Sequence, residues 1–243
     1  MAEPGTLSIL LLQGDAEAQL LADAELALPL VFPDREVQMV RAWMSRPDWL
    51  RSDATAGQVR EARDRLEQPH TLVILSLLPA VAVRALRHSS GELFLEHRGV
   101  RAQWSAEQAA ANDAACTVQA PLSPQDAAAA LEPIVERLQQ RGAAVALTTG
   151  FRHVREPLQH RHTADPQTLR DRVRRTNLEV ARLSHRTGCF VLDLDRSLAQ
   201  RGGGPLGADC FGGAAQAAEL AVEEFVALIA DALPDELLSA GAQ

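Results

Sequence analysis

The chain has 243 residues, 24 basic and 32 acidic side chains, and a formal net charge of −8. Every basic residue is an arginine and there is no tyrosine, which excludes Schiff-base or Walker lysines and a tyrosine acid. The negative net charge argues against nucleic-acid binding, so we expect no nucleic-acid partner. Three cysteines without a secretion signal indicate a reduced, cytoplasmic protein. No apolar run reaches the roughly 18 residues of a membrane span, so we expect no membrane partner.

Apolar runs of strand length alternate along the chain with segments of helical periodicity. In chain order we expect strand Thr6–Gln13, helix Asp15–Leu28, strand Glu36–Ala42, helix Ala56–Glu67, strand Thr71–Leu78, helix Ser105–Ala115, a helix from Ser123 or Pro124 to Gln140, strand Ala143–Thr149, helix Asp165–His185, strand Cys189–Asp195 and helix Ala214–Leu233. This alternation predicts an α/β fold, a three-layer α/β/α sandwich around a five-stranded parallel sheet. The expected strand order is flavodoxin-like, 2-1-3-4-5.

The region between the third strand and the Ser123 helix is less regular. Val81–His88 has the pattern of one or two helical turns, and Gly91–Trp104 that of an irregular hairpin. We interpret the chain as a single domain with an insertion at about 91–122. The arginines of Arg170–Arg175 have helical spacing, which favours a solvated helix face.

Ligands of parallel α/β sheets bind beyond the carboxyl ends of the strands. Functional residues are therefore expected after Gln13, Leu78, Gly150 and Asp195. At the first of these ends, Gly14, Asp15, Ala16 and Glu17 lie where a strand turns into a helix, and free amides there could bind an anionic group. A simpler interpretation is that Asp15 only caps the helix.

The motifs in their order resemble those of the SGNH/GDSL hydrolases. The matching blocks are Gly14-Asp15-Ala16, Asp53–Gly57, Val73–Val81, Ala143–Gly150, a long helix bearing Asn177, Phe190–Asp195, and Asp209-Cys210-Phe211-Gly212 before the last helix. This resemblance covers nearly the whole chain except Gly91–Leu122. It implies an ester-hydrolysing fold with a Ser-His-Asp site at the carboxyl edge.

The chain departs from the family pattern at the catalytic positions. Ala16 stands where the family has its nucleophilic serine, and Gly212 where it has its histidine. The position of the oxyanion-hole asparagine falls near Ala80. Of the three triad residues, only the aspartate, Asp209, is retained. Acyl transfer by such a triad needs a hydroxyl nucleophile and an imidazole base, and neither alanine nor glycine can supply them.

Other side chains near these strand ends could rebuild a site. Cys210 could act as a nucleophile if a helix N-terminus lowers its pKa, although a filler thiol is the simpler interpretation. Arg152 could hold an anion and His153 could move a proton, or both could be ordinary loop residues. Asp193 and Asp195 resemble a phosphatase Asp-x-Asp only weakly, and His160 with His162 lacks the further ligands of a structural metal.

Three functions remain open from the sequence. The preferred one is a catalytically degenerate SGNH-hydrolase-like protein that binds an acyl-, glycosyl- or CoA-type ligand, small or protein-borne, or a partner protein. The alternatives are an active acyl hydrolase or acyltransferase with a rebuilt site, and a structural scaffold subunit. We expect no cofactor and no metal, and assembly as a homo- or hetero-oligomer stays open. The expected ligand-binding residues are Gly14, Asp15, Ala16, Glu17, Gly57, Arg152, His153 and Asp209.

Overall fold

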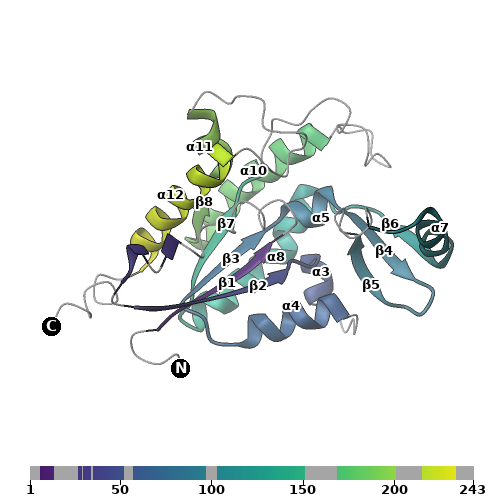
Figure 1. The fold of residues 1–243 in the computed structure, drawn as a ribbon, viewed down its shortest axis with the longest axis horizontal. Helices are drawn as coiled ribbons and strands as arrows, with labels where there is room; N and C mark the ends of the chain where they lie inside the picture. The colour runs from purple at the N-terminus through teal and green to yellow at the C-terminus, as the bar shows by residue number, and fades with distance from the viewer. Residues whose placement is uncertain are drawn as a thin grey trace.

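A five-stranded parallel sheet forms the centre of the computed structural model, which describes residues 6–13, 27–28, 30–33, 35–51, 57–96, 103–150, 169–200 and 215–233. The sheet has the order β2-β1-β3-β7-β8 (Figure 1). Its strands are β1 (Thr6–Gln13), β2 (Glu36–Trp43), β3 (Leu72–Ser76), β7 (Ala144–Thr148) and β8 (Phe190–Leu192). The predicted fold class and strand order are confirmed.

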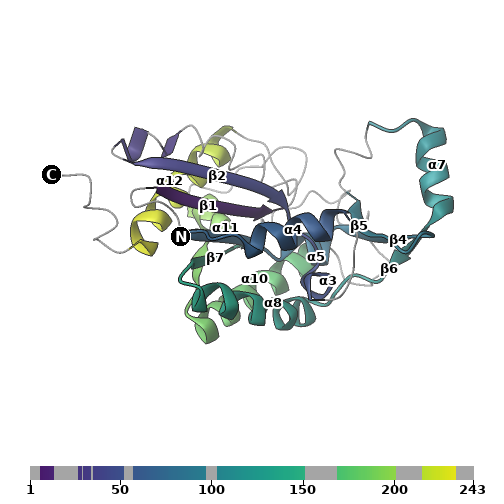
Figure 2. The ribbon, with the colours of Figure 1, turned by 90° about the horizontal axis from the view of Figure 1, so that it is seen from below.

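Helices cover both faces of this sheet (Figure 2). One face carries α4 (Gly57–Glu67), α8 (Pro124–Gln140) and α10 (Leu169–Thr187), and the other carries α12 (Ala215–Ala232). Three short helices follow strand ends: α3 (Pro47–Leu50), α5 (Leu78–Ala82) and α11 (Leu194–Gln200). Among the described helices, none is long and apolar enough to cross a membrane.

The side chains of β1 alternate between two apolar clusters, one on each face of the sheet. Leu10 and Leu12 pack into the cluster under α4 and α8, while Ile9 and Leu11 pack into the cluster under α12. All four are fully buried. A strand that is covered on both faces needs a continuous apolar run, which explains the sequence of β1.

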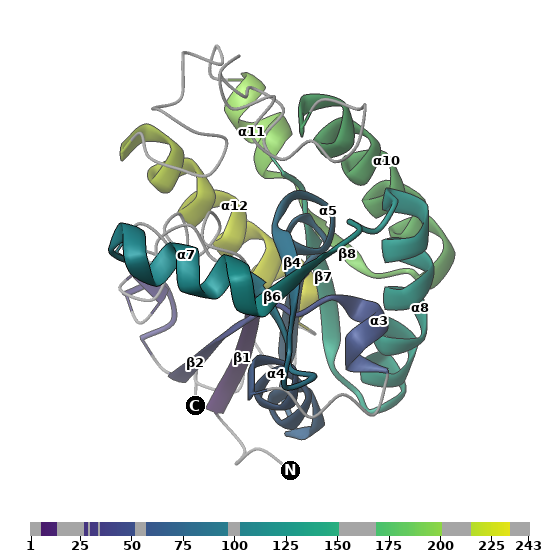
Figure 3. The same cartoon turned by 90° about the vertical axis from the view of Figure 1, so that its right-hand side faces the viewer.

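A second, antiparallel sheet projects beyond the carboxyl ends of the parallel strands (Figure 3). It has the order β5-β4-β6, with β4 (Arg84–His88), β5 (Leu93–Glu96) and β6 (Cys116–Gln119), and it carries α7 (Ala106–Ala115). The expectation of helical turns over Val81–His88 was wrong in its second half, because α5 ends at Ala82 and a strand follows. Pairing of β4 with two neighbours stabilises the extended form of this short segment.

Local signals placed several helix ends correctly. Ser105 begins α7 with a capping box in which its side chain and that of Gln108 each accept from the other's backbone amide. Ser123 is the N-cap of α8, and its hydroxyl accepts a hydrogen bond from the backbone amide of Asp126. Gly142 follows α8 with a φ of 86°, the left-handed conformation that glycine adopts at low cost.

Two expectations about the last third of the chain were wrong. The strand expected over Cys189–Asp195 ends at Leu192, because Asp193 caps the short helix that follows: its carboxylate accepts from the amide of Arg196. The expected solvated face of Arg170–Arg175 includes Arg172, which is only 2% exposed. Helical spacing alone did not reveal that this arginine faces the rest of the protein.

Candidate functional site at the carboxyl edge

The carboxyl ends of β1, β3 and β7 lie side by side because these strands are parallel and paired in register. Leu78 follows β3 and Gly150 follows β7. A Cβ atom built on Gly150 would lie 3.1 Å from the Leu78 side chain and 3.3 Å from that of Val173 in α10. The expectation that Leu78 and Gly150 meet at one edge is therefore confirmed. Gly57 is the exposed first residue of α4, and a Cβ atom built on it would meet no other atom within 4 Å.

Most residues proposed for ligand binding or catalysis lie outside the described residues. These are Gly14, Asp15, Ala16, Glu17, Arg152, His153, Asp209, Cys210 and Gly212, together with His160 and His162. Their roles stay predictions from the sequence. In the chain, the segments that they occupy follow β1, follow β7 and precede α12.

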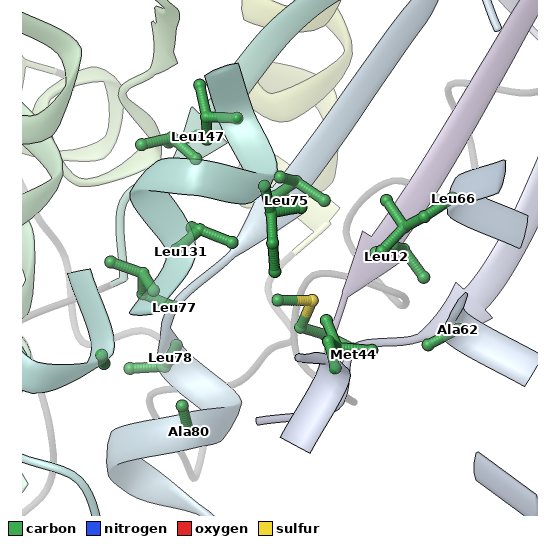
Figure 4. Close-up of a cluster of buried hydrophobic side chains, with 14 of the residues drawn as sticks. Leu12, Met44, Ala62, Leu66, Leu75, Leu77, Leu78, Ala80, Leu131 and Leu147 are labelled. Atoms are coloured by element: carbon green, nitrogen blue, oxygen red, sulfur yellow. The ribbon is translucent and has the colours of Figure 1, made fainter. Parts of the chain in front are cut away.

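The segment after β3, to which the sequence resemblance assigns the oxyanion hole, is apolar and buried. Leu77, Leu78, Ala80 and Val81 are at most 3% exposed and belong to the core cluster (Figure 4). Ala80 lies inside α5, which begins directly after β3. No side-chain amide is therefore available at this point of the described edge to stabilise an oxyanion.

A network of polar side chains lies at the ends of β7 and β8. The hydroxyl of Thr149 donates to the carboxylate of Asp193 over 2.9 Å and accepts from the backbone amide of Asp195 over 3.1 Å. The hydroxyl of Ser197 donates to the carbonyl of Asp193. Asp193 and Asp195 thus anchor the turn from β8 into α11, which explains these acids as structural groups.

Asn177 of α10 connects to the loop after β7. Its amide nitrogen donates to the carbonyl of Gly150 over 2.7 Å, and its amide oxygen accepts from the Gly150 amide over 2.8 Å. Both backbone polar groups of Gly150 are thereby satisfied by one side chain. Asn177 was one of the residues on which the family resemblance depended, and its contacts show that it positions this loop.

Thr148 and Ser76 are a register pair at the ends of β7 and β3. Ser76 is fully buried, and its hydroxyl accepts from the amide of Leu78. Thr148 is 3% exposed, and its Oγ1 has no hydrogen-bond partner among the described residues. A buried hydroxyl without a partner is costly, so Thr148 is a point of local destabilisation at the end of β7.

The sequence analysis missed Arg46, a buried arginine that follows β2. Its guanidinium makes two hydrogen bonds to the carboxylate of Asp48, of 3.1 and 2.8 Å, and a third to the carbonyl of Ala120. It also lies over the ring of Trp49, 4.9 Å from the centroid. Arg46 therefore ties α3 to the segment that leads back from the small sheet into α8. The only signal for it in the sequence is its position after a strand.

No group of three metal-binding side chains occurs among the residues that the structure describes. The described part of the edge thus offers backbone turns, a buried hydroxyl and an apolar wall. The described residues at this edge include no nucleophile paired with a base. The chemistry of the remaining part depends on the residues that follow β1 and β7.

The architecture is that of an SGNH-hydrolase-like α/β fold. The sequence by itself matches no protein-family model and no curated protein. A Slackia heliotrinireducens protein assigned as an SGNH hydrolase has a TM-score of 0.57 to this chain at 14% identity, covering 92% of this chain and 99% of its own.

Esterases of the same architecture are also similar in structure. The acetylxylan esterase Axe2 from Geobacillus stearothermophilus has a TM-score of 0.56 at 13% identity, covering 93% of this chain and 96% of its own. The acetyl xylan esterase AlAXEase has a TM-score of 0.54 at 11% identity, covering 91% and 98%. At such low identities the similarity establishes the fold and leaves the function to the residues of this chain.

Proposed function

We propose that this chain is a catalytically degenerate SGNH-hydrolase-like protein that binds an acyl-, glycosyl- or CoA-type ligand, or a partner protein carrying one, at the carboxyl edge of the sheet. The proposal is supported by an SGNH-hydrolase-like fold in which the positions that the motif order assigns to the three reactive residues hold none of them. Ala16 and Gly212 replace the serine and the histidine, and Ala80 is buried in α5 where an asparagine would be needed.

An example among the similar structures is a catalytic mutant of Axe2 in which a serine is replaced by alanine. Its crystal structure shows that this fold tolerates such a replacement. In the present chain, the position that the motifs assign to the serine is the natural residue Ala16. A protein of this kind would keep its binding surface without forming an acyl-enzyme.

The residues expected to hold the ligand are those predicted from the sequence after β1, after β7 and before α12. Free amides at Asp15–Glu17 and the guanidinium of Arg152 would bind an anionic group, and His153 would add a hydrogen bond. Asp15 and Asp209 bring negative charge, so the ligand should also carry hydroxyl or amine donors.

A second candidate is a structural scaffold subunit. It is favoured by the apolar side chains of Leu77, Leu78, Ala80 and Val81, which fill the described edge between β3 and β7. A scaffold would bind neither small ligand, whereas a binding protein would bind at least one.

Calorimetric titration with acetyl-CoA and with an acetylated xylo-oligosaccharide separates the two candidates. The binding function predicts heat of binding without release of acetate. Arg152→Ala and Asp15→Ala should each weaken binding about tenfold, equivalent to ~1.4 kcal/mol. Arg174→Ala, at an exposed position of α10, is the matched control and should bind as the wild type does.

Hydrolysis of either probe would instead favour an active enzyme with a rebuilt site. The decisive observation would be an organophosphonate label on a side chain beyond the carboxyl ends of the strands, such as Cys210. Absence of binding by both probes would favour the scaffold function.

A further inference from the structure

A serine and a histidine form a hydrogen-bonded pair at the opposite, amino edge of the parallel sheet. Ser8 lies near the start of β1, and His70 precedes β3. The Ser8 Oγ is 3.1 Å from the Nδ1 of His70, and both side chains are half-buried. Gln13, at the carboxyl end of β1, is five positions beyond Ser8, about 16 Å at 3.3 Å per residue. The pair is therefore separate from the candidate site described above.

The hydrogen bonds of His70 determine which ring nitrogen carries the proton. Nε2 lies 2.9 Å from the backbone carbonyl of Arg65, near the end of α4. A carbonyl oxygen only accepts hydrogen bonds, so Nε2 is the protonated nitrogen and Nδ1 has the free lone pair. The hydroxyl of Ser8 consequently donates to Nδ1, which is the arrangement of a nucleophile and its general base, with the base oriented by a third group.

The surroundings keep the imidazole in its basic form. Burial lowers the pKa of His70 below its usual value; the hydrogen bond to the Arg65 carbonyl opposes this shift in part, and the positive charges of Arg141 and Arg65 add to it. Arg141 itself is held by hydrogen bonds to the carbonyls of Leu66 and Glu67 and by an ion pair with the Glu67 carboxylate. Its positive charge, which disfavours an imidazolium, would equally favour an oxyanion that forms on a substrate beside Ser8.

We propose that Ser8 is a nucleophile, activated by His70, that accepts the acyl group of small activated esters. Ser8 Oγ forms a bond to the acyl carbon while its proton passes to Nδ1 of His70. The ester C–O bond then breaks, and the proton leaves with the alcohol or phenol. In the second step water attacks the acyl-serine, His70 takes the water's proton, and the acid and free Ser8 are released.

The chain offers a matched control in a second serine–histidine pair. The hydroxyl of Ser90 lies 2.8 Å from Nδ1 of His88 in the exposed turn between β4 and β5. There, however, the Ser90 backbone amide also donates to Nδ1, so this lone pair is already occupied. Ser90→Ala should therefore leave acyl uptake unchanged.

The experiment mixes the purified full chain with p-nitrophenyl acetate and follows both nitrophenolate release and the mass of the protein. We expect a burst approaching one equivalent per chain and an acetyl group on the peptide that contains Ser8. Ser8→Ala should abolish the burst and His70→Gln should slow it at least tenfold, with melting temperatures recorded for each variant. An unchanged burst in Ser8→Ala, no burst in the wild type, or acetyl on another residue would each overturn the proposal.

This proposal and the proposed function fail in distinguishable ways. Peptide mapping of the wild-type protein needs no variant, so it remains decisive if Ser8→Ala fails to fold. Acetyl on Ser8 leaves the degenerate carboxyl edge intact, since the label lies at the other end of β1. Acetyl on Cys210 would contradict both.

Discussion

The side chain of Asn177 and the backbone of Gly150 form a reciprocal pair of hydrogen bonds that joins α10 to the end of β7. The two residues are 27 positions apart in the chain. The pair fixes the position of the chain directly after β7, at Gly150. Asn177 is therefore a sensitive point for the stability of the protein.

Asn177→Ala should lower the free energy of unfolding by about 1–3 kcal/mol, since it leaves the amide and carbonyl of Gly150 without their partner. Urea unfolding followed by circular dichroism measures the change. Leu178→Ala is the control on the next residue of α10, because Leu178 is 50% exposed and its loss should cost less than about 0.5 kcal/mol. Equal effects of the two substitutions would contradict this role of Asn177.

Gly150→Ala should also destabilise the protein, by about 1–3 kcal/mol, because the added methyl group would press against Leu78 and Val173. Combining it with Leu78→Ala makes room for that methyl group. In this double-mutant cycle the cost of Gly150→Ala should fall by more than about 0.5 kcal/mol. An additive result would show that the contact with Leu78 is not the cause.

The stability of the protein should depend on the protonation of His70. Since burial lowers the pKa of His70 in the folded state, folding disfavours its charged form. Its contribution is therefore fully present above the unfolded pKa of about 6.5 and is lost as the pH falls through the folded pKa. Unfolding free energies measured between pH 8 and pH 5 should fall less steeply in His70→Gln than in the wild type. Parallel curves would contradict the prediction.

The two described cysteines should differ in reactivity. Cys189 is buried, and burial raises the pKa of its thiol, whereas Cys116 is partly exposed. Because the thiolate is the reactive form, brief treatment with iodoacetamide at pH 8 should modify Cys116 well before Cys189. Mass spectrometry of tryptic peptides measures both. In denaturant the two rates should converge, and equal rates in the native protein would show that Cys189 is accessible.

Local sequence signals predicted the parallel sheet and most helix ends. The continuous apolar run of β1 is typical of a strand that is covered on both faces, so the burial of this strand could be inferred from its composition alone. Ser105 and Ser123 cap helices through contacts three residues away, which a linear pattern contains. The strand order followed because right-handed crossovers leave few alternatives.

The errors fall where a residue's state depends on distant partners. Arg84–His88 is a strand because β5 and β6 pair with it, and nothing in its own five residues requires that. Arg172 has the spacing of a solvated face but is buried against the rest of the protein. Helix and strand periodicities report the local backbone and cannot report what covers a face.

The sequence by itself determined which residue types are present, while the assignment of Ala16 and Gly212 to the serine and histidine positions of a hydrolase follows from motif order and stays a prediction. Only the tertiary structure decided that Ala80 is buried in a helix and that Ser8 meets His70, which lies 62 residues away. Such contacts arise from the pairing of parallel strands, which brings together segments that are separated by a whole crossover. Chemistry that depends on two side chains becomes visible only once that pairing is known.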